Sequence, residues 1–155
     1  EGQETGLCRG DGSCDCRRRH AEQEVIGLDS NVLVRYLTQD DPAQARKANR
    51  VVEQALRAGE SLYLNHVVMC ELNWVLASAY DYDRAELADA IEKILSAAQF
   101  EFEDKNALWQ AVAGFRQSGA DFADCLIGAK NVGAGCTSTL TFDKRAGALP
   151  QFSLS

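Results

Sequence analysis

The sequence lacks any long apolar run, and none approaches the roughly 18 consecutive residues that a membrane-spanning helix needs. Its opening residues also lack the apolar stretch of a secretory signal peptide. These two absences argue against a membrane partner and predict a cytoplasmic protein. At 155 residues, the chain has room for one domain that can bury a substantial hydrophobic core.

Positive charge is also scarce, since 16 Lys and Arg stand against 23 Asp and Glu and the formal net charge is -7. Nucleic-acid-binding proteins usually display a broad basic face, so this composition argues against a conventional one. Two partners suit an acidic protein better: a divalent metal ion and a basic protein. Any contact with nucleic acid would have to come from a few local Lys and Arg side chains.

Residues 1–24 are poor in apolar side chains, with Leu7 as the one large apolar residue. Such a segment cannot bury enough surface to offset the entropy lost on ordering. We therefore expect a disordered leader or tag, followed by a single domain at residues 25–155. Three cysteines and one histidine of the leader have a spacing, C-x5-C-x-C-x3-H, that matches no standard pair of zinc ligands: Cys8, Cys14, Cys16 and His20.

From Val25 onward, short apolar runs alternate with helical periodicity. Strands are predicted at 25–29, 62–64, 100–103, 137–142 and 152–154. Helices are predicted from Ser30, which would cap the first of them, and then at 42–58, 67–79, from about 83, around 108–115 and at 122–130. Strands that alternate with helices imply an α/β protein with a parallel sheet covered on both faces. We expect three layers, α/β/α, with a central parallel sheet of about five short strands.

Acidic residues mark the ends of several predicted elements. Asp29 ends the first strand and Asp143 follows the fourth, so both are expected at the carboxyl edge of the sheet, where open α/β sheets bind ligands. Asp121 and Asp124 are three residues apart at a helix start and share one face. Glu71 lies within an apolar helix, where an unpaired buried carboxylate would be costly.

Each acid has a structural alternative when it is taken alone. Asp29 is as well suited to capping a helix as to catalysis, and Asp121 is better suited to capping. Glu71 could pair with an arginine at the edge of the core. Asp143 could serve a turn, because TFDKR has a turn-like composition. No single acid is therefore specific for a function.

Together, the acids indicate a cation site. Like charges gathered at one sheet edge repel by roughly 4 kcal/mol per close pair at an effective dielectric constant near 20, whereas an exposed salt bridge returns only about 0–1 kcal/mol. A bound divalent cation, or an arginine from a partner, would resolve this conflict. Carboxylate ligands without a nearby histidine suit Mg²⁺ or Mn²⁺ better than zinc.

Four segments that carry these acids resemble the motifs of the PIN-domain family, in the same order along the chain. VIGLDSNVLVRYLTQDD resembles the opening of that domain, VVMCELNWVL its second acidic motif, and SGADFADCLIGAKNVGAGC and TLTFDKRA its last two. The likeness covers residues 25–155 and points to the VapC-type toxin ribonucleases of VapBC toxin–antitoxin pairs. One departure is Ser30, where threonine is commoner, and serine preserves the hydroxyl group.

The resemblance implies a PIN-like fold and a Mg²⁺-dependent endoribonuclease, the toxin of a type II toxin–antitoxin system, which hydrolyses RNA phosphodiester bonds. Mn²⁺ is expected to substitute for Mg²⁺, and one or two ions would activate a water and stabilise the charge on phosphorus. The implied catalytic residues and metal ligands are Asp29, Glu71, Asp124 and Asp143, with Asp121 as a fifth metal ligand. The residues implied to orient the ligands or water are Ser30, Asn31 and Thr141.

The resemblance also implies partners for the chain. An RNA substrate, a basic VapB-like antitoxin and a second copy of the chain in a homodimer are expected. Lys and Arg near the acidic motifs would hold RNA phosphates, and Arg35 and Lys144 are favoured for this role over Arg116, Lys130 and Arg145.

Two alternatives remain open. A receiver-like Mg²⁺-binding signalling domain also places acids at the edge of a parallel sheet, but it needs paired acids where Asp29 stands alone, and it gives Glu71 no role. A non-catalytic PIN-like binding module would not need the full set of acids that this sequence retains. A dinucleotide-binding enzyme is excluded, because no G-x-G-x-x-G follows the first strand.

Overall fold

The computed structural model describes residues 24–155. The predicted leader, apart from Glu24, lies outside the described residues, as do its three cysteines and His20. Within residues 24–155, no helix combines the length and the apolar character that crossing a membrane would require.

Six α-helices and one short 3₁₀-helix, η1, make up most of the described chain, and each predicted helix is confirmed. Asp41 accepts two backbone N–H hydrogen bonds at the start of the second helix, where Pro42 occupies the first turn. Gly59 ends the same helix with φ 70°, a left-handed conformation that glycine adopts without strain. The bounds are α1 (Ser30–Thr38), α2 (Pro42–Ala58), α3 (His66–Ala79), α4 (Arg84–Ser96), α5 (Lys105–Gln117), α6 (Phe122–Gly133) and η1 (Ala146–Ala148).

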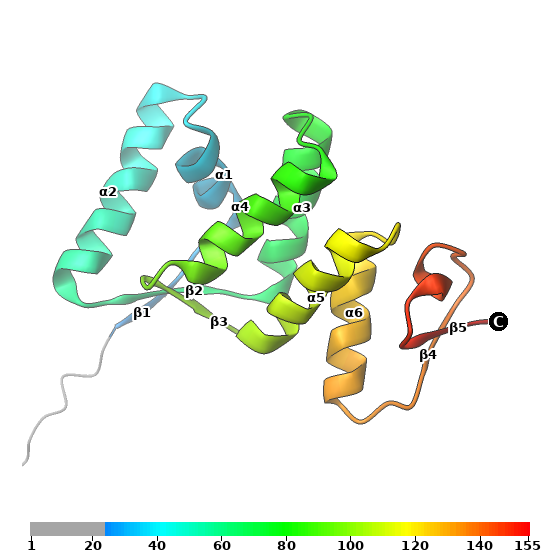
Figure 1. Cartoon of the computed structure of the whole chain (residues 1–155). Coiled ribbons are helices and arrows are strands. Elements are labelled where there is room, and N and C mark those ends of the chain that lie inside the picture. Colours follow the sequence, from blue (N-terminus) through cyan, green and yellow to red (C-terminus); the bar gives the residue numbers. More distant parts are fainter. Residues whose placement is uncertain (1–23) are drawn as a thin grey trace, which may run out of the picture.

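The five predicted strands are present, but they form two sheets (Figure 1). β1 (Val25–Gly27), β2 (Ser61–Leu64) and β3 (Phe100–Phe102) make a parallel sheet in the order β1-β2-β3. β4 (Thr139–Thr141) and β5 (Phe152–Leu154) make a separate parallel pair. The α/β class and the parallel pairing are therefore confirmed, whereas the single sheet of about five strands is divided into three strands and two.

The hydrophobic core lies between the helices and one face of the three-stranded sheet. On this face Leu62 is in register between Ile26 and Phe100. Leu62 and Leu64 are fully buried, and burial of each such side chain contributes about 1.5–3 kcal/mol to stability. The opposite face carries Glu101, which is exposed. The sheet is thus anchored from the helical side.

The C-terminal unit, residues 134–155 with β4, η1 and β5, is held on α6. Gly128 of α6 lies so close to this unit that a Cβ atom there would be 2.6 Å from Gln151 Nε2 and 2.7 Å from the Phe152 ring. Leu149 is 5% exposed and belongs to the main core. Figure 1 shows β4 and β5 on the far side of α6 from the three-stranded sheet. Docking on α6 therefore sets the position of the last two strands.

Candidate acidic site

Asp29 lies just beyond β1, at the N-cap position of α1. Its carboxylate makes no hydrogen bond to the backbone of the helix that follows. Instead, Asp29 Oδ2 accepts a hydrogen bond of 2.9 Å from the side-chain amide of Asn31. Asn31 therefore orients the exposed carboxylate of Asp29 from only two residues away.

Ser30 links α1 to α3. It is the first residue of α1 rather than its N-cap, so the predicted capping role of Ser30 is wrong. The backbone enters the helix at Asp29, one residue earlier. Ser30 is buried, and its Oγ donates a hydrogen bond of 2.9 Å to Glu71 Oε2 on α3. The hydroxyl group thus orients a second acid of the site.

Glu71 is exposed, so the cost of an unpaired buried carboxylate does not arise. Helix α3 buries one stripe, which includes Leu72 and Leu76, and leaves another open to solvent. Val67 and Trp74 on the open stripe are 74% and 67% exposed. Glu71 lies four residues after the first and three before the second, on the same side of the helix. The apolar composition of α3 did not predict this exposed side of the helix.

Asp121 and Asp124 lie at the start of α6. Asp121 occupies the N-cap position, but its side chain makes no capping hydrogen bond. Partial burial raises the pKa of the Asp124 carboxyl group, and the negative charges of Asp121 and Asp143 raise this pKa further. A backbone hydrogen bond from Asp121 and the positive charge of Arg145 act in the opposite direction. Asp124 is therefore close enough to both other carboxylates to be repelled by them.

Asp143 lies in the turn after β4, where short hydrogen bonds fix the backbone. Its N–H donates to Thr141 Oγ1 at 3.0 Å, and its Oδ1 accepts from the backbone N–H of Arg145 at 2.6 Å. Thr141 therefore orients the turn that carries Asp143. Lys144, predicted as an RNA contact, is exposed on this turn. Arg145, the less favoured RNA contact, lies close enough to Asp124 for its positive charge to lower the pKa of that carboxyl group.

The interactions of the five acids link them in two groups. Asp29 and Glu71 belong to the first group, through their bonds to the neighbours Asn31 and Ser30. The second group contains Asp121, Asp124 and Asp143. Within residues 24–155, no three His, Cys, Asp or Glu side chains converge closely enough to hold a metal ion. The strand that precedes Asp143, β4, pairs with β5 and not with β1, the strand that precedes Asp29.

Two of the acids, Asp29 and Asp121, differ from the other N-cap residues of the described α-helices. Asp41, Asn65, Asp83 and Asp104 each accept a backbone N–H hydrogen bond at the start of α2, α3, α4 and α5, respectively. Such a bond stabilises a helix by about 1 kcal/mol. Asp29 and Asp121 make no such bond, although they occupy the same position at α1 and α6. Their carboxylates remain available for another partner.

Arg35 is engaged by protein groups. Its guanidinium bonds Asp40 at 2.6 Å, the Tyr80 hydroxyl at 2.9 Å and Gln44 at 2.9 Å. The hydrogen bonds from Tyr80 and Arg35 hold the pKa of the Asp40 carboxyl group well below its usual range. An RNA contact through Arg35 would compete with these bonds, and no feature of the sequence pointed to Asp40 or Tyr80. Arg116 is likewise bound, to Asp89 and Glu92.

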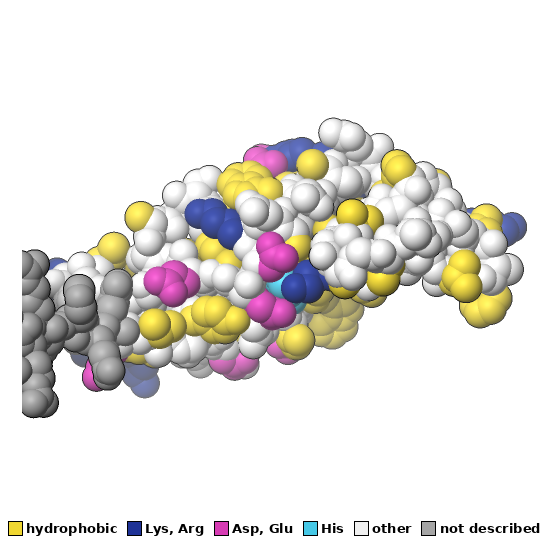
Figure 2. Space-filling model, turned by 90° about the horizontal axis from the view of Figure 1, so that it is seen from below, with side chains coloured by type: hydrophobic (Ala, Val, Ile, Leu, Met, Phe, Trp, Pro, Cys, Tyr) yellow, Lys and Arg dark blue, Asp and Glu magenta, His cyan; other side chains and the backbone are white. Residues whose placement is uncertain are grey.

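A mixed cluster of charges lies at the N-terminus of α3. His66 Nδ1 is 3.1 Å from Glu103 Oε1, and Lys130 Nζ is 3.8 Å from Glu103 and from Asp104. Hydrogen bonding from the His66 backbone is the largest cause of a lowered pKa at Glu103. Figure 2 shows histidine, acidic and basic side chains adjoining on the face seen from below. Lys130 is therefore an element of this cluster, separate from the five acids.

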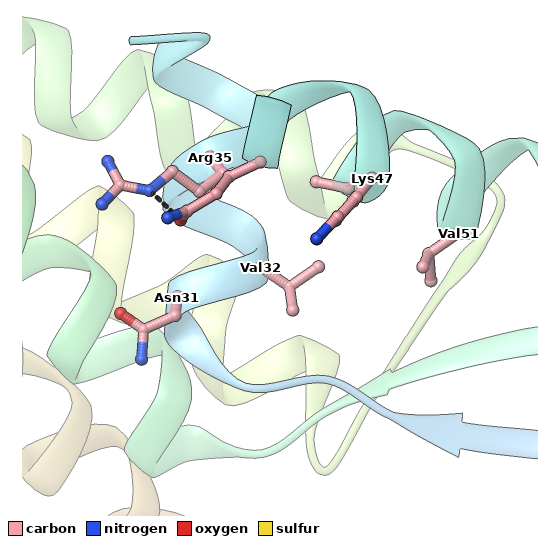
Figure 3. Close-up of a pocket in the computed structure, with 7 residues that line it drawn as sticks. Asn31, Val32, Arg35, Lys47 and Val51 are labelled. Atoms are coloured by element: carbon pink, nitrogen blue, oxygen red, sulfur yellow. Dashed lines mark hydrogen bonds between the residues drawn. The ribbon is translucent and has the colours of Figure 1, made fainter. Parts of the chain in front are cut away.

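A hollow opens between α1 and α2 (Figure 3). Its volume is about 220 Å³, and its apolar floor is formed by Val32, Ala48 and Val51. Asn31 and Lys47 lie at its rim, with the bonded side chains of Arg35 and Gln44. Asn31, which donates a hydrogen bond to Asp29, is thus also part of the wall of this hollow.

Comparison with known proteins places these features in a family. The PIN domain family model matches residues 26–150, a range that contains all five acids. A VapC ribonuclease of Aquifex aeolicus (strain VF5) is 25% identical over 118 residues, which make up 76% of this chain and 87% of the relative. The fold, the order of the acids and the matched range agree, and the chain belongs to the PIN domain family.

Proposed function

We propose that this chain is a metal-dependent endoribonuclease that acts as the toxin of a toxin–antitoxin pair. The observation that carries the proposal is the pair of unused N-caps, Asp29 and Asp121. Each of these two residues lacks the capping hydrogen bond, which is worth about 1 kcal/mol, and each is an acid of the segments that resemble the PIN motifs. The similarity to a relative named VapC ribonuclease supports the same function.

The residues present fit a hard divalent cation. All five donors are carboxylates, a donor set that suits Mg²⁺, with Mn²⁺ as its substitute. Asp29 and Glu71 would supply ligands from one side, and Asp121, Asp124 and Asp143 from the other. Partial burial and the charges of Asp121 and Asp143 raise the pKa of Asp124, and a positive ion would offset both effects. When bound, the cation would activate a water and stabilise negative charge on the phosphodiester.

Neutral side chains would set the positions of the acids. Ser30 Oγ holds Glu71, Asn31 Nδ2 holds Asp29, and Thr141 Oγ1 orders the turn before Asp143. Hydrogen bonds of this kind fix ligand orientation, and their loss typically costs about 10–100-fold in metal affinity or activity.

The substrate would be single-stranded or looped RNA, held by cations close to the acids. Lys144 is exposed beside Asp143 and is our first choice, with Arg145 next to it. Arg35 would contact RNA only by exchanging its bond to Asp40 for a bond to an RNA phosphate. The net charge of -7 suits a basic VapB-like antitoxin as the second partner. A homodimer is expected as well, and the exposed Val67 and Trp74 of α3 offer apolar contact area.

The test is cleavage of a fluorescent single-stranded RNA by the purified chain in Mg²⁺, in Mn²⁺ and in excess EDTA. Cleavage is expected in both metals and should vanish in EDTA and in the Asp29→Asn variant. Full cleavage in EDTA would refute metal dependence. One observation favours the alternative of a non-catalytic PIN-like module: in the described chain no three candidate ligands converge. RNA binding without cleavage under every metal condition would support that alternative.

A further inference from the structure

The turn between α5 and α6 carries the chain into the second group of acids. α5 ends at Gln117 and α6 begins at Phe122, so residues 118–121 connect the two helices and end at Asp121. α5 packs against both α4 and α6 (Figure 1). The last four carbonyl groups of a helix have no partner within that helix and need another donor. For the end of α5, the donor comes from α4.

Arg84, the half-buried first residue of α4, supplies this donor. Its Nη1 donates hydrogen bonds to Phe115 O at 2.7 Å and to Ala120 O at 3.0 Å, and its Nη2 donates to Gly119 O at 3.3 Å. Its guanidinium carbon also lies 4.1 Å from the centre of the Phe115 ring. A planar guanidinium holds its donors in a fixed geometry, unlike the flexible ammonium group of a lysine. Arg84 therefore joins the last turn of α5 to the residue that precedes Asp121.

The peptide unit between Ala120 and Asp121 extends this connection to Asp124. Arg84 binds the carbonyl oxygen at one end of this unit. At the other end, the N–H of Asp121 donates a hydrogen bond to the Asp124 carboxylate. Because a peptide unit is planar, the direction of its N–H follows from the position of its carbonyl group. A cation bonded to the carbonyl oxygen also polarises the unit and strengthens its N–H as a donor. The orientation of the Asp124 carboxylate therefore depends on Arg84.

Packing also restrains this peptide unit. Ala120 and Phe122, on either side of Asp121, are fully buried. The Phe122 ring meets the Phe115 ring edge to face, with 6.1 Å between the ring centres. The Asp121 side chain makes no capping bond that would fix it to α6. Its position is therefore set through the backbone that Arg84 holds.

We propose that Arg84 is a positioning residue of the acidic site, which holds Asp121 and Asp124 in place through the carbonyl groups of the turn. In this role Arg84 contacts neither the substrate nor an ion and acts through the backbone. The cation that the two acids would bind, and the cleavage that the cation would support, rest on the proposed function. The connection from Arg84 to Asp124 through one peptide unit does not.

Arg116 provides a matched control, because it also connects α5 to α4. Its guanidinium pairs with Asp89 and Glu92 of α4. Arg84→Met and Arg116→Met each remove one positive charge and one connection between the same two helices, and methionine keeps an apolar stem in place of the arginine stem. If Arg84 only ties α4 to α5, both variants should lose stability and leave the amide group of Asp121 unchanged.

The first measurement is the amide signal of Asp121 in ¹⁵N-labelled protein without divalent ions. In the wild type, the bond to Asp124 should shift the amide proton downfield and protect it from exchange with solvent. Arg84→Met should move this signal upfield and speed its exchange by about 10-fold, the effect of losing one hydrogen bond, whereas Arg116→Met should leave it unchanged. Arg84→Lys keeps the charge and should give an intermediate signal, and it decides the question if Arg84→Met does not fold. An Asp121 amide that is the same in the wild type and in a folded Arg84 variant would overturn the proposal.

The second measurement is the Mn²⁺ affinity of the protein without RNA, by isothermal titration calorimetry. Displaced ligands should weaken binding in Arg84→Met by about 10–100-fold, the range typical of groups that orient metal ligands. Arg84→Lys should recover part of this affinity, and Arg116→Met should bind Mn²⁺ like the wild type. In cleavage assays, kcat should fall in Arg84→Met while KM for RNA stays the same, because Arg84 binds the turn and not the substrate. A raised KM with an unchanged kcat would overturn the proposal.

The two measurements separate the role of Arg84 from the proposed function. If the wild type neither binds Mn²⁺ nor cleaves RNA while Arg84→Met changes the Asp121 amide and Arg116→Met does not, the proposed function fails and the role of Arg84 stands. If the wild type binds Mn²⁺ and cleaves RNA, and Arg84→Met does both equally well, the role of Arg84 is overturned and the function stands.

Discussion

The two groups of acids differ in how their carboxylates are held. In the first, Asp29 and Glu71 each accept a hydrogen bond from a neutral side chain, Asn31 or Ser30. In the second, partial burial raises the pKa of the Asp124 carboxyl group, and the charges of Asp121 and Asp143 raise this pKa further. Hydrogen bonds position the carboxylates of the first group without an ion. In the second group, a bound cation would reduce the repulsion between the carboxylates. A cation should therefore act mainly on the energy of the second group.

The largest effect is expected from removing one negative ligand from either group. Asp29→Asn and Asp124→Asn should each reduce cleavage by more than about 100-fold, because a neutral amide binds a divalent cation weakly. Asp121→Asn should retain measurable activity and need more Mg²⁺. Rates measured against Mg²⁺ concentration check this ranking. If Asp121→Asn is as inactive as Asp29→Asn while Asp124→Asn still cuts RNA, the order within the second group is reversed.

Loss of a positioning bond in the first group should have an intermediate effect. Ser30→Ala removes the hydroxyl that holds Glu71, and activity should fall by about 10–100-fold. Ser30→Thr keeps the hydroxyl and should restore most of the rate. The measurement is kcat and KM for both variants at saturating Mg²⁺. Equal losses in the two variants would show that packing around the buried Ser30, and not its hydrogen bond, sustains the site.

The sequence predicted the elements of the fold better than their assembly. Local signals such as Pro42 and Gly59 fixed the ends of α2, because helix caps depend on neighbouring residues alone. The division into two sheets depends on the long-range contact of Gly128 with the C-terminal unit. Three-residue strands carry too little pattern to choose between β1 and α6 as the neighbour of that unit.

The candidate site shows the same limit. The motifs identified five acids and three polar neighbours, and hydrogen bonds place Ser30, Asn31 and Thr141 beside three of those acids. The capping role of Ser30 was wrong because Asp29 and Ser30 are both good N-caps, and composition cannot choose between adjacent positions. The apolar sequence of α3 did not reveal the solvent-exposed side on which Glu71 lies.

The raised pKa of Asp124 predicts a pH-dependent stability. An acid whose pKa is higher in the folded state destabilises that state above its folded pKa, and the penalty disappears below the unfolded pKa. Asp124→Asn should therefore unfold at a higher temperature than wild type near pH 7, and the difference should vanish near pH 3. Excess Mg²⁺ should raise the melting temperature of the wild type and have less effect on the variant. A gap that persists unchanged at low pH would contradict this cause.

The smallest effect concerns the unused caps. Asp83 caps α4 through its side chain, and Asp121 occupies the same position of α6 without a capping bond. Replacement by alanine removes a negative charge from the positive end of a helix in both cases, so the helix-dipole contribution of about 0.3–1 kcal/mol cancels in the comparison. What remains is the capping bond of Asp83, worth about 1 kcal/mol, and the relief of repulsion on Asp124 in the other variant. Asp83→Ala should thus lower the free energy of unfolding by at least about 1 kcal/mol more than Asp121→Ala, as measured by urea denaturation without divalent ions. Equal losses would mean that the Asp121 carboxylate stabilises α6 in solution, and the argument that it is kept free for a cation would fail.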